Sequence, residues 1–277
     1  MEEPLSNLLN EDDAELSGPA DGNVPEVLTR YFIEFKYKGT AYSGWQIQKN
    51  ADSVQAHLDK ALSTLFGKTI ETTGSSRTDT GVHALHQAAH FEAGPIKDFG
   101  ICVYRLNALL PYDIAVLSVY PVKPAAHSRF DATHRRYEYH IIQHKNPFRQ
   151  GLAWFHPKPL NVSAMQQAAD LLLSHTDYQA FCKVHTDVNN YNCIISRAEW
   201  TQQPDVLVFT IQANRFLRGM VRALVGTMEM LGSGKITVAD FKNLLSENHR
   251  SKAGHAAPAH GLFLAEVGYG PGLRLEE

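Results

Sequence analysis

The sequence predicts an α+β fold built from two ferredoxin-like halves, and three observations support this prediction. Several short segments alternate apolar and polar residues, which is typical of β-strands with one buried face. Other segments repeat apolar residues every three or four positions, as on the buried face of a helix. In residues 29–124 these segments follow the order β-α-β-β-α-β, the ferredoxin-like order of a sheet with helices on one side.

The first half begins with a strand, where Tyr31, Ile33 and Phe35 alternate with Glu34 and other neighbours. The next element is a helix over residues 54–65, preceded by Asp52 or Ser53 as N-cap and followed by Gly67. The remaining elements of this half are a strand at 69–73, a strand at 87–92, a helix at 101–110 and a strand at 114–119.

The second half contains elements of the same kinds, so we expect the two halves to meet near residues 121–124. Its longest apolar stripe predicts a helix over residues 216–231. The other predicted elements are strands at 135–143, 194–201, 206–213 and 262–267, and helices at 162–173 and 238–245. We therefore predict an N-terminal half at 29–124 and a C-terminal half at 125–277.

The composition indicates a soluble protein. The chain has 277 residues, 44% hydrophobic and 20% charged, with no apolar run near the roughly 18 residues of a membrane helix. The N-terminus carries no signal-peptide core, so we expect a cytoplasmic protein with no membrane contact. Its three cysteines form no Cys-x-x-Cys pair and predict neither a disulfide framework nor structural zinc.

Charge is unevenly distributed along the chain. Residues 1–29 hold eight of the 29 acidic residues and no Lys or Arg. Residues 30–277 therefore carry 21 acidic and all 26 basic residues, a mildly basic balance that permits a nucleic-acid partner without requiring one. We interpret residues 1–28 as an acidic disordered tail.

One loop concentrates chemically useful side chains. Between the strands at 69–73 and 87–92, residues 74–84 hold Arg77, Asp79 and His83 among small polar residues and glycine. Asp near Gly is typical of a connecting turn, whereas Arg, Asp and His together are typical of an active site. Composition alone leaves both interpretations open.

Two further groups are ambiguous in the same way. Arg215, Arg218 and Arg222 are spaced to share one face of the predicted helix, either as a solvated edge or as a contact to phosphate or carboxylate. A partly inward Arg222 would need an acidic partner, and Asp79 would supply it. Aromatic residues such as Tyr137 belong either to the core or to a surface that stacks a flipped base.

Six blocks of sequence, in one order, resemble the TruA-type tRNA pseudouridine synthases. The signature R-T-D-x-G-V-H-A corresponds to residues 77–84. The other blocks lie at residues 37–55, 106–114, 127–139, 216–226 and 257–264. Ser76, Thr80, His86 and Ala126 depart from the family pattern, although none replaces a residue expected to act in the chemistry.

The resemblance implies a pseudouridine synthase fold, in which the two halves join into one mainly antiparallel sheet with helices packed on it. It implies isomerisation of uridine to pseudouridine at positions 38, 39 and 40, in the anticodon stem-loop of tRNA. No metal or cofactor is required, and a homodimer is expected.

Residue roles also follow from the resemblance. Asp79 is the expected nucleophile or base, with Arg222 as its ion-pair partner. Tyr137 is the residue expected to stack on the flipped uracil and to relay the C5 proton. Arg77 is expected to keep the nucleotide extruded or to hold its phosphate. Contacts with RNA are also expected for His83, Arg129 and Arg218, and Phe130 is expected in the core.

Two alternatives remain at the level of sequence. One is a non-catalytic RNA-binding protein on a ferredoxin-like platform, which would not need the Asp79–Arg222 pair. The other is a metal-dependent RNA hydrolase using Asp79, His83 and Asp187. A two-metal site would need a second carboxylate clustered with Asp79, and the sequence lacks one.

Overall fold

The fold was obtained as a computed structural model, which describes residues 28–183, 190–247 and 254–275. The acidic tail expected at residues 1–28 falls almost entirely outside these ranges, and so does Asp187.

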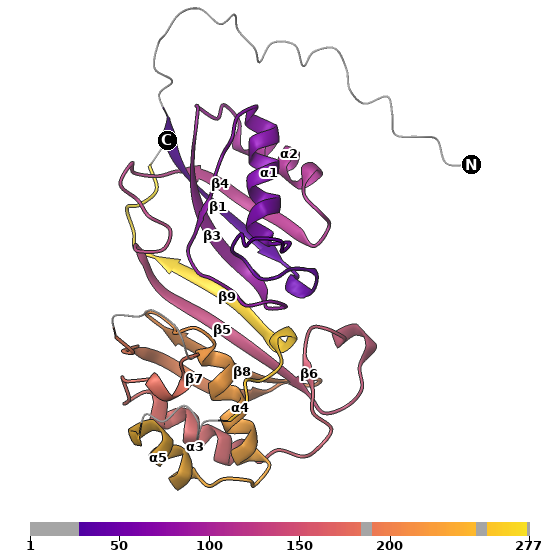
Figure 1. Cartoon of the computed structure of the whole chain (residues 1–277), viewed down its shortest axis with the longest axis vertical. Helices are drawn as coiled ribbons and strands as arrows, with labels where there is room; N and C mark the ends of the chain where they lie inside the picture. Colours follow the sequence, from indigo (N-terminus) through magenta and orange to yellow (C-terminus); the bar gives the residue numbers. More distant parts are fainter. Residues whose placement is uncertain (1–27, 184–189, 248–253, 276–277) are drawn as a thin grey trace, which may run out of the picture.

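Nine strands of the described chain form one sheet in the order β4-β1-β3-β9-β5-β8-β7, with β2 paired to β3 and β6 paired to β5 (Figure 1). The strands are β1 (Thr29–Tyr37), β2 (Thr73–Gly74), β3 (His83–Ala93), β4 (Ile114–Pro121), β5 (Ala132–Ile142), β6 (Trp154–Phe155), β7 (Ile195–Gln202), β8 (Leu207–Ala213) and β9 (Leu262–Tyr269). Most pairs are antiparallel, which confirms the predicted α+β fold with a mainly antiparallel sheet.

The join between the two ends of the sheet is narrow. Strand β9 runs antiparallel to β5 over much of its length but pairs with β3 in parallel through only two residue pairs, His83–Phe263 and Ala84–Leu264. The final strand therefore links the first strands of the chain to the strands of the second half. Division of the chain near residue 124 stays a prediction.

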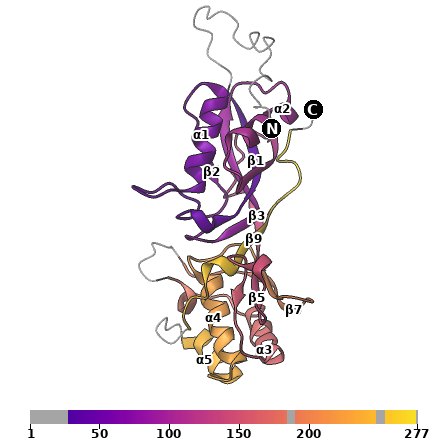
Figure 2. The same cartoon turned by 90° about the vertical axis from the view of Figure 1, so that its right-hand side faces the viewer.

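Five α-helices of the described chain accompany the sheet in two groups, α1 and α2 beside β1 and β4, and α3, α4 and α5 towards the opposite end (Figures 1 and 2). They are α1 (Val54–Phe66), α2 (Phe99–Leu109), α3 (Val162–Leu172), α4 (Met220–Gly232) and α5 (Val238–Glu247). Buried residues from all five join alternate residues of the strands in one hydrophobic cluster. Burial of this shared apolar face is what holds the helices on the sheet.

Local signals set the ends of α1 as the sequence predicts. Ser53 is the N-cap, and its hydroxyl accepts a hydrogen bond from the Ala56 amide. Gly67 follows the last turn with φ of 66°, a left-handed conformation that glycine adopts without strain.

The strand predicted at residues 69–73 is wrong except at its last residue, because side chains of α1 satisfy its backbone. The Asp59 carboxylate accepts hydrogen bonds from the Thr72 amide and hydroxyl, and Ser63 Oγ accepts from the Ile70 amide. These amides are then not available to a strand neighbour, and β2 is only two residues long.

The helix predicted at residues 216–231 begins later, at Met220. Gly219, at the N-cap, has φ of 71°, which interrupts a right-handed helix before that point. Arg215 and Arg218 precede the helix, so the predicted common face of Arg215, Arg218 and Arg222 is wrong.

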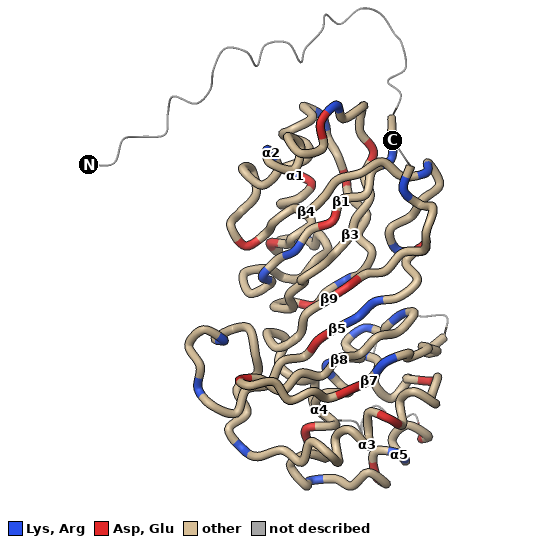
Figure 3. Tube along the Cα trace, turned by 180° about the vertical axis from the view of Figure 1, so that it is seen from behind, with Lys and Arg blue, Asp and Glu red and all other residues tan. Residues whose placement is uncertain are grey.

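Away from the helices, the sheet presents polar and charged side chains. Figure 3 shows Lys, Arg, Asp and Glu along these strands as seen from behind. Arg136 of β5, for example, pairs with Glu266 of β9 at 2.8 Å. Within the described ranges, no helix is both long and apolar enough to cross a membrane.

Candidate active site

Asp79 lies in a tight turn between β2 and β3. The Val82 amide donates to the Asp79 carbonyl at 3.1 Å, and the Gly81 amide donates to the Tyr42 carbonyl at 3.3 Å. Gly81 has φ of 77°, so the turn requires glycine at this position. Residues 83 and 84, which were expected in the loop, already belong to β3.

The loop before α1 packs against this turn. The Trp45 amide donates to the Thr78 carbonyl at 3.3 Å. Two glycines allow the close approach, because a Cβ on Gly44 would lie 2.3 Å from Thr78 O and one on Gly39 would lie 1.9 Å from Val82 O. Gly39 and Gly44, which belong to the sequence block at residues 37–55, therefore shape the turn that holds Asp79.

Alternation within the turn directs Asp79 outward. Thr78 is buried, and its Oγ1 lies 2.8 Å from the Tyr37 hydroxyl in the core. Asp79, the next residue, keeps 30% of its side chain exposed. The carboxylate is thereby fixed in direction and still open to a substrate.

Arg222 approaches Asp79 from the first turn of α4. Its Nη1 lies 3.3 Å from Asp79 Oδ2, and its side chain is 22% exposed. Nε of the same guanidinium donates to the Ala257 carbonyl at 2.7 Å, while the Ala257 amide donates to the Arg222 carbonyl at 2.9 Å. The Nε bond therefore orients the guanidinium towards the carboxylate, and the bond from the Ala257 amide fixes the Arg222 backbone.

Tyr137 lies on β5, opposite Ile211 of β8 and Leu264 of β9. Its ring meets Phe216 edge-on at 5.1 Å between centroids. Burial and the nearby Asp79 carboxylate raise the pKa of Tyr137 to about 12, against an opposing effect of Arg135. The phenol is therefore protonated at neutral pH, and electrostatically close to Asp79.

The other predicted residues divide into exposed and buried ones. Arg77, Arg129 and Arg218 are exposed and free of any acidic partner nearer than 4 Å in the described residues. His83 is only 1% exposed. Its Nδ1 accepts from the Gly39 amide at 3.0 Å, and its Nε2 lies 3.2 Å from the His260 carbonyl oxygen. This interior position does not favour the expected contact with RNA.

Arg135 is a residue of the site that the sequence interpretation missed. It is buried on the same face of β5 as Tyr137, and its guanidinium makes five hydrogen bonds. The acceptors are Ser76 Oγ and the carbonyls of Ser75, Arg129, Ala132 and Asn214. Extending the alternation of β5 back by two residues from Tyr137 would have placed Arg135 on this face.

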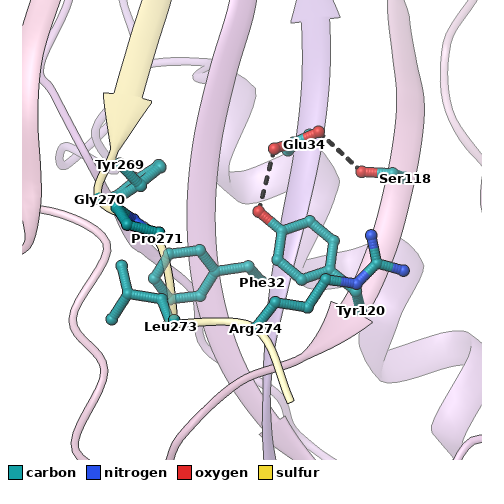
Figure 4. A pocket seen from close by; sticks show the side chains of 10 residues that line it. Phe32, Glu34, Ser118, Tyr120, Tyr269, Gly270, Pro271, Leu273 and Arg274 are labelled. Atoms are coloured by element: carbon teal, nitrogen blue, oxygen red, sulfur yellow. Dashed lines mark hydrogen bonds between the residues drawn. The ribbon is translucent and has the colours of Figure 1, made fainter. Parts of the chain in front are cut away.

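A separate pocket of about 380 Å³ lies on the polar face of the sheet (Figure 4). There, the His86 ring at 3.6 Å and hydrogen bonds from Ser118 and Tyr120 lower the pKa of Glu34 to about 2, against the opposing effect of burial. The lining also includes Phe32, Tyr269 and Arg274 but none of the predicted site residues. We therefore place the candidate active site at Asp79 and not in this pocket.

No group of three or more His, Cys, Asp or Glu residues able to hold a metal ion occurs in the described part of the chain. Around Asp79 the described partners are instead an arginine, a tyrosine and backbone groups.

Comparison with known proteins gives a consistent result. A family model described as tRNA pseudouridine synthase matches residues 34–131 and 168–270. A protein of Bacteroides fragilis named tRNA pseudouridine synthase A is 48% identical over 242 residues, covering 87% of this chain and 96% of that protein. Proteins with the same name from Parabacteroides distasonis (45% over 243 residues, 87% and 96%) and Thermoanaerobacter sp. (38% over 244 residues, 86% and 98%) are also similar.

Proposed function

The chain belongs to the tRNA pseudouridine synthase family and isomerises uridine in tRNA, and on that premise we propose that Asp79 is its nucleophile. The observation that carries this proposal is the 3.3 Å contact between Asp79 Oδ2 and Arg222 Nη1 in a half-exposed position. The Arg222 guanidinium holds the Asp79 carboxylate in position, and a carboxylate is the group that attacks or assists cleavage.

The reaction rearranges bonds within one nucleoside. The bond between N1 of uracil and C1′ of ribose breaks, the base turns, and C5 bonds to C1′ while its proton is lost and N1 gains one. Nothing is oxidised or reduced overall, and no water is consumed. Asp79 acts either as a nucleophile at C1′ or as a base that removes a proton from the ribose. Arg222 keeps the Asp79 carboxylate directed at the sugar.

Tyr137 is proposed as the surface on which the flipped uracil rests. Because the pKa of Tyr137 is raised to about 12, its phenol is suited to stacking and to donating a hydrogen bond, not to acting as a phenolate base. Flipping the uridine out of a stem costs a few kcal/mol, which contacts to the flanking RNA must offset. Arg77, Arg129 and Arg218 are exposed cations suited to phosphate contacts of that kind.

The finer assignments belong to the same proposal. We place the target uridines at positions 38, 39 and 40, in the anticodon stem-loop, and we propose a homodimer and a cytoplasmic location. The exposed cations Arg77, Arg129 and Arg218 support RNA recognition by shape and charge. Light scattering of the purified protein measures the mass of the assembly, and a monomeric mass would exclude the homodimer.

Mapping of pseudouridine in unmodified tRNA transcripts, with a chelator present, tests the function. We expect product at positions 38–40 with the wild-type protein and a loss of at least roughly 10³-fold in rate with Asp79→Asn. Asp205→Asn, which alters an exposed carboxylate in the β7–β8 turn, is the matched control and keeps full activity.

Other results of this experiment would refute parts of the proposed function. Unchanged activity in Asp79→Asn would refute the nucleophile, and product at a distant position would refute the target site. Tight binding of tRNA by the wild-type protein with no product would favour the non-catalytic RNA-binding alternative.

A further inference from the structure

Phe130 is exposed where the sequence interpretation placed a core residue. The residue is 73% exposed, and it lies just before the start of β5. Single exposed apolar side chains are common, so exposure alone indicates nothing. What distinguishes Phe130 is the way the surrounding turn, residues 127–131, is built.

The turn is closed by hydrogen bonds within itself. The His127 amide donates to Asp131 Oδ2 at 2.7 Å, and the Asp131 amide donates to the His127 carbonyl at 3.0 Å. His127 Nδ1 in turn accepts from the amides of Arg129 and Phe130, at 3.1 Å and 3.4 Å. The backbone that carries Phe130 is therefore fixed before any ligand binds.

The turn is also anchored to the body of the protein. Ser128 is fully buried; its hydroxyl donates to the Thr73 carbonyl at 2.6 Å, and its carbonyl accepts from the Tyr269 hydroxyl at 2.6 Å. Arg135 Nη2 donates to the Arg129 carbonyl at 2.6 Å. A rigid support of this kind lowers the entropy that a contact with a ligand would otherwise cost.

These anchors connect the turn to the strand and loop that hold Asp79. Thr73 belongs to β2, which leads directly into the loop of Asp79, and Arg135 Nη2 also donates to the Ser75 carbonyl at 3.0 Å. The two segments are therefore held by the same guanidinium. An RNA with its target uridine at Asp79 would pass close to residues 127–131.

The chemistry around the ring suits a nucleobase. The Arg129 guanidinium lies 5.5 Å from the Phe130 ring centroid, and the His127 ring lies 4.3 Å from it. Aromatic rings next to an arginine bind single-stranded nucleic acid, because the ring stacks on a base while the cation meets the phosphate. With these two neighbours in place, Phe130 is still 73% exposed.

We infer that Phe130 is a stacking platform for a nucleobase next to the target uridine. When the uridine leaves the helical stack, its neighbour loses one stacking partner, and the Phe130 ring replaces it. The inference rests on the proposed function for the identity of the RNA. It adds a binding site for a second nucleotide, outside the Asp79–Arg222 pair.

Binding of an anticodon stem-loop RNA to three variants tests this site by fluorescence anisotropy. Base–aromatic stacking contributes roughly five- to hundredfold to affinity, so Phe130→Ala is expected to raise Kd about tenfold. Phe130→Tyr keeps an aromatic ring and stays within about twofold of wild type. Phe148→Ala is the matched control, because Phe148 is a surface phenylalanine with 88% exposure on the segment Pro147–Arg149, and it leaves Kd unchanged.

RNAs with a single abasic nucleotide on either side of the target identify the stacked base. One of the two abasic RNAs is expected to bind the wild-type protein about tenfold more weakly, yet to bind Phe130→Ala no more weakly than the intact RNA does. Additive losses, or a Phe130→Ala variant that binds as wild type, would overturn the platform.

The two proposals fail in different ways. If the wild-type protein forms pseudouridine and Phe130→Ala has no effect, only the platform is refuted. If binding depends on Phe130 but no pseudouridine forms, the platform stands and the proposed function is refuted. Absence of any binding to the anticodon stem-loop would refute the platform and its RNA together.

Discussion

Arg135 is a buried cation whose five hydrogen bonds all end on neutral oxygens. Burial lowers its pKa from the usual arginine value, which is the electrostatic cost of this position. In return, its planar fork fixes the segments at Ser75, at Arg129 and at Asn214 with one side chain. No other standard side chain offers five donors in that geometry.

Replacing Arg135 by Lys keeps the charge and removes most of these bonds. Carbonyls left without donors in the interior cost about 1–3 kcal/mol, so we expect Arg135→Lys to lower the free energy of unfolding by about 2–3 kcal/mol in urea titrations. Arg136→Lys is the control. Its neighbour Glu266 forms a half-exposed pair with Arg136, and such pairs contribute at most about 1 kcal/mol. Equal stability losses in the two variants would contradict the role of Arg135.

Arg222 presents a similar contrast between charge and geometry. Arg222→Lys retains a cation near Asp79 but lacks the fork that reaches Ala257 O and Asp79 Oδ2 together. We expect kcat to fall roughly 10²-fold with little change in KM, because the carboxylate loses its orientation and RNA contacts elsewhere persist. A change confined to KM in single-turnover and steady-state assays would indicate that Arg222 binds RNA instead.

Among the elements, α1 illustrates how a helix can support an active site at a distance. Its Asp59 binds the amide and hydroxyl of Thr72, just before β2 and the Asp79 loop. Desolvation raises the pKa of Asp59 from 3.8 to about 6, despite these two bonds. The buried carboxylate therefore binds its proton more tightly in the folded chain than in the unfolded chain.

This shift predicts a definite dependence of stability on pH. A raised carboxylate pKa favours the folded state below the unfolded pKa of 3.8, and the benefit is lost as pH rises through about 6. Asp59→Asn keeps an oxygen acceptor for Thr72 without the charge. We expect the variant to gain about 1–3 kcal/mol over wild type above pH 6 and to lose that advantage towards pH 4, in urea titrations across pH. A gain independent of pH would contradict this account.

The loop between β1 and α1 shapes the Asp79 turn by steric fit. A Cβ at Gly39 would lie 1.9 Å from Val82 O, so Gly39→Ala must displace one of the two backbones. We expect a loss of about 3 kcal/mol in stability and roughly 10²-fold in activity, since Val82 closes the turn on Asp79.

Gly67→Ala separates steric clash from backbone strain. Its position is open, and its φ of 66° carries only the left-handed strain of about 1 kcal/mol. Thermal unfolding and pseudouridine formation compare the two variants. Similar activity in both would show that the fit at Gly39 does not position Asp79.

The helix and strand ends that the sequence predicted correctly depend on neighbours in the chain, as with Ser53 and Gly67 around α1. The predictions were wrong where the local structure depends on contacts or backbone conformations that the neighbouring residues do not indicate. Backbone amides in residues 69–72 donate hydrogen bonds to side chains of α1. Helix α4 begins later than predicted because Gly219 adopts a left-handed φ, which the residue type alone does not predict. Phe130 was expected in the core but lies in a surface turn, whose backbone is held by hydrogen bonds within residues 127–131.

At the scale of the whole molecule, the sheet order is what the sequence reasoning lacked. Periodicity identifies β9 as a strand but does not reveal that it lies between β3 and β5. Asp79 and Arg222 are 143 residues apart, and their pairing was suggested by the need of an inward arginine for an acidic partner and by the family resemblance, not by spacing along the chain. The burial of His83 has the same origin, because it lies at the two-pair join of β3 with β9.

The position of β9 also constrains how the protein is made. Every other strand precedes β9 in the chain, so the ribosome completes β3 long before the strand that pairs with its first two residues, His83 and Ala84. Until then the nascent chain exposes unpaired amides and carbonyls at this edge of β3, where other chains can pair with it. A translation pause before Leu262 would leave Asp79 and Arg222 on halves not yet joined through β9. We therefore expect catalytic competence to be acquired late in synthesis, after β9 has been made.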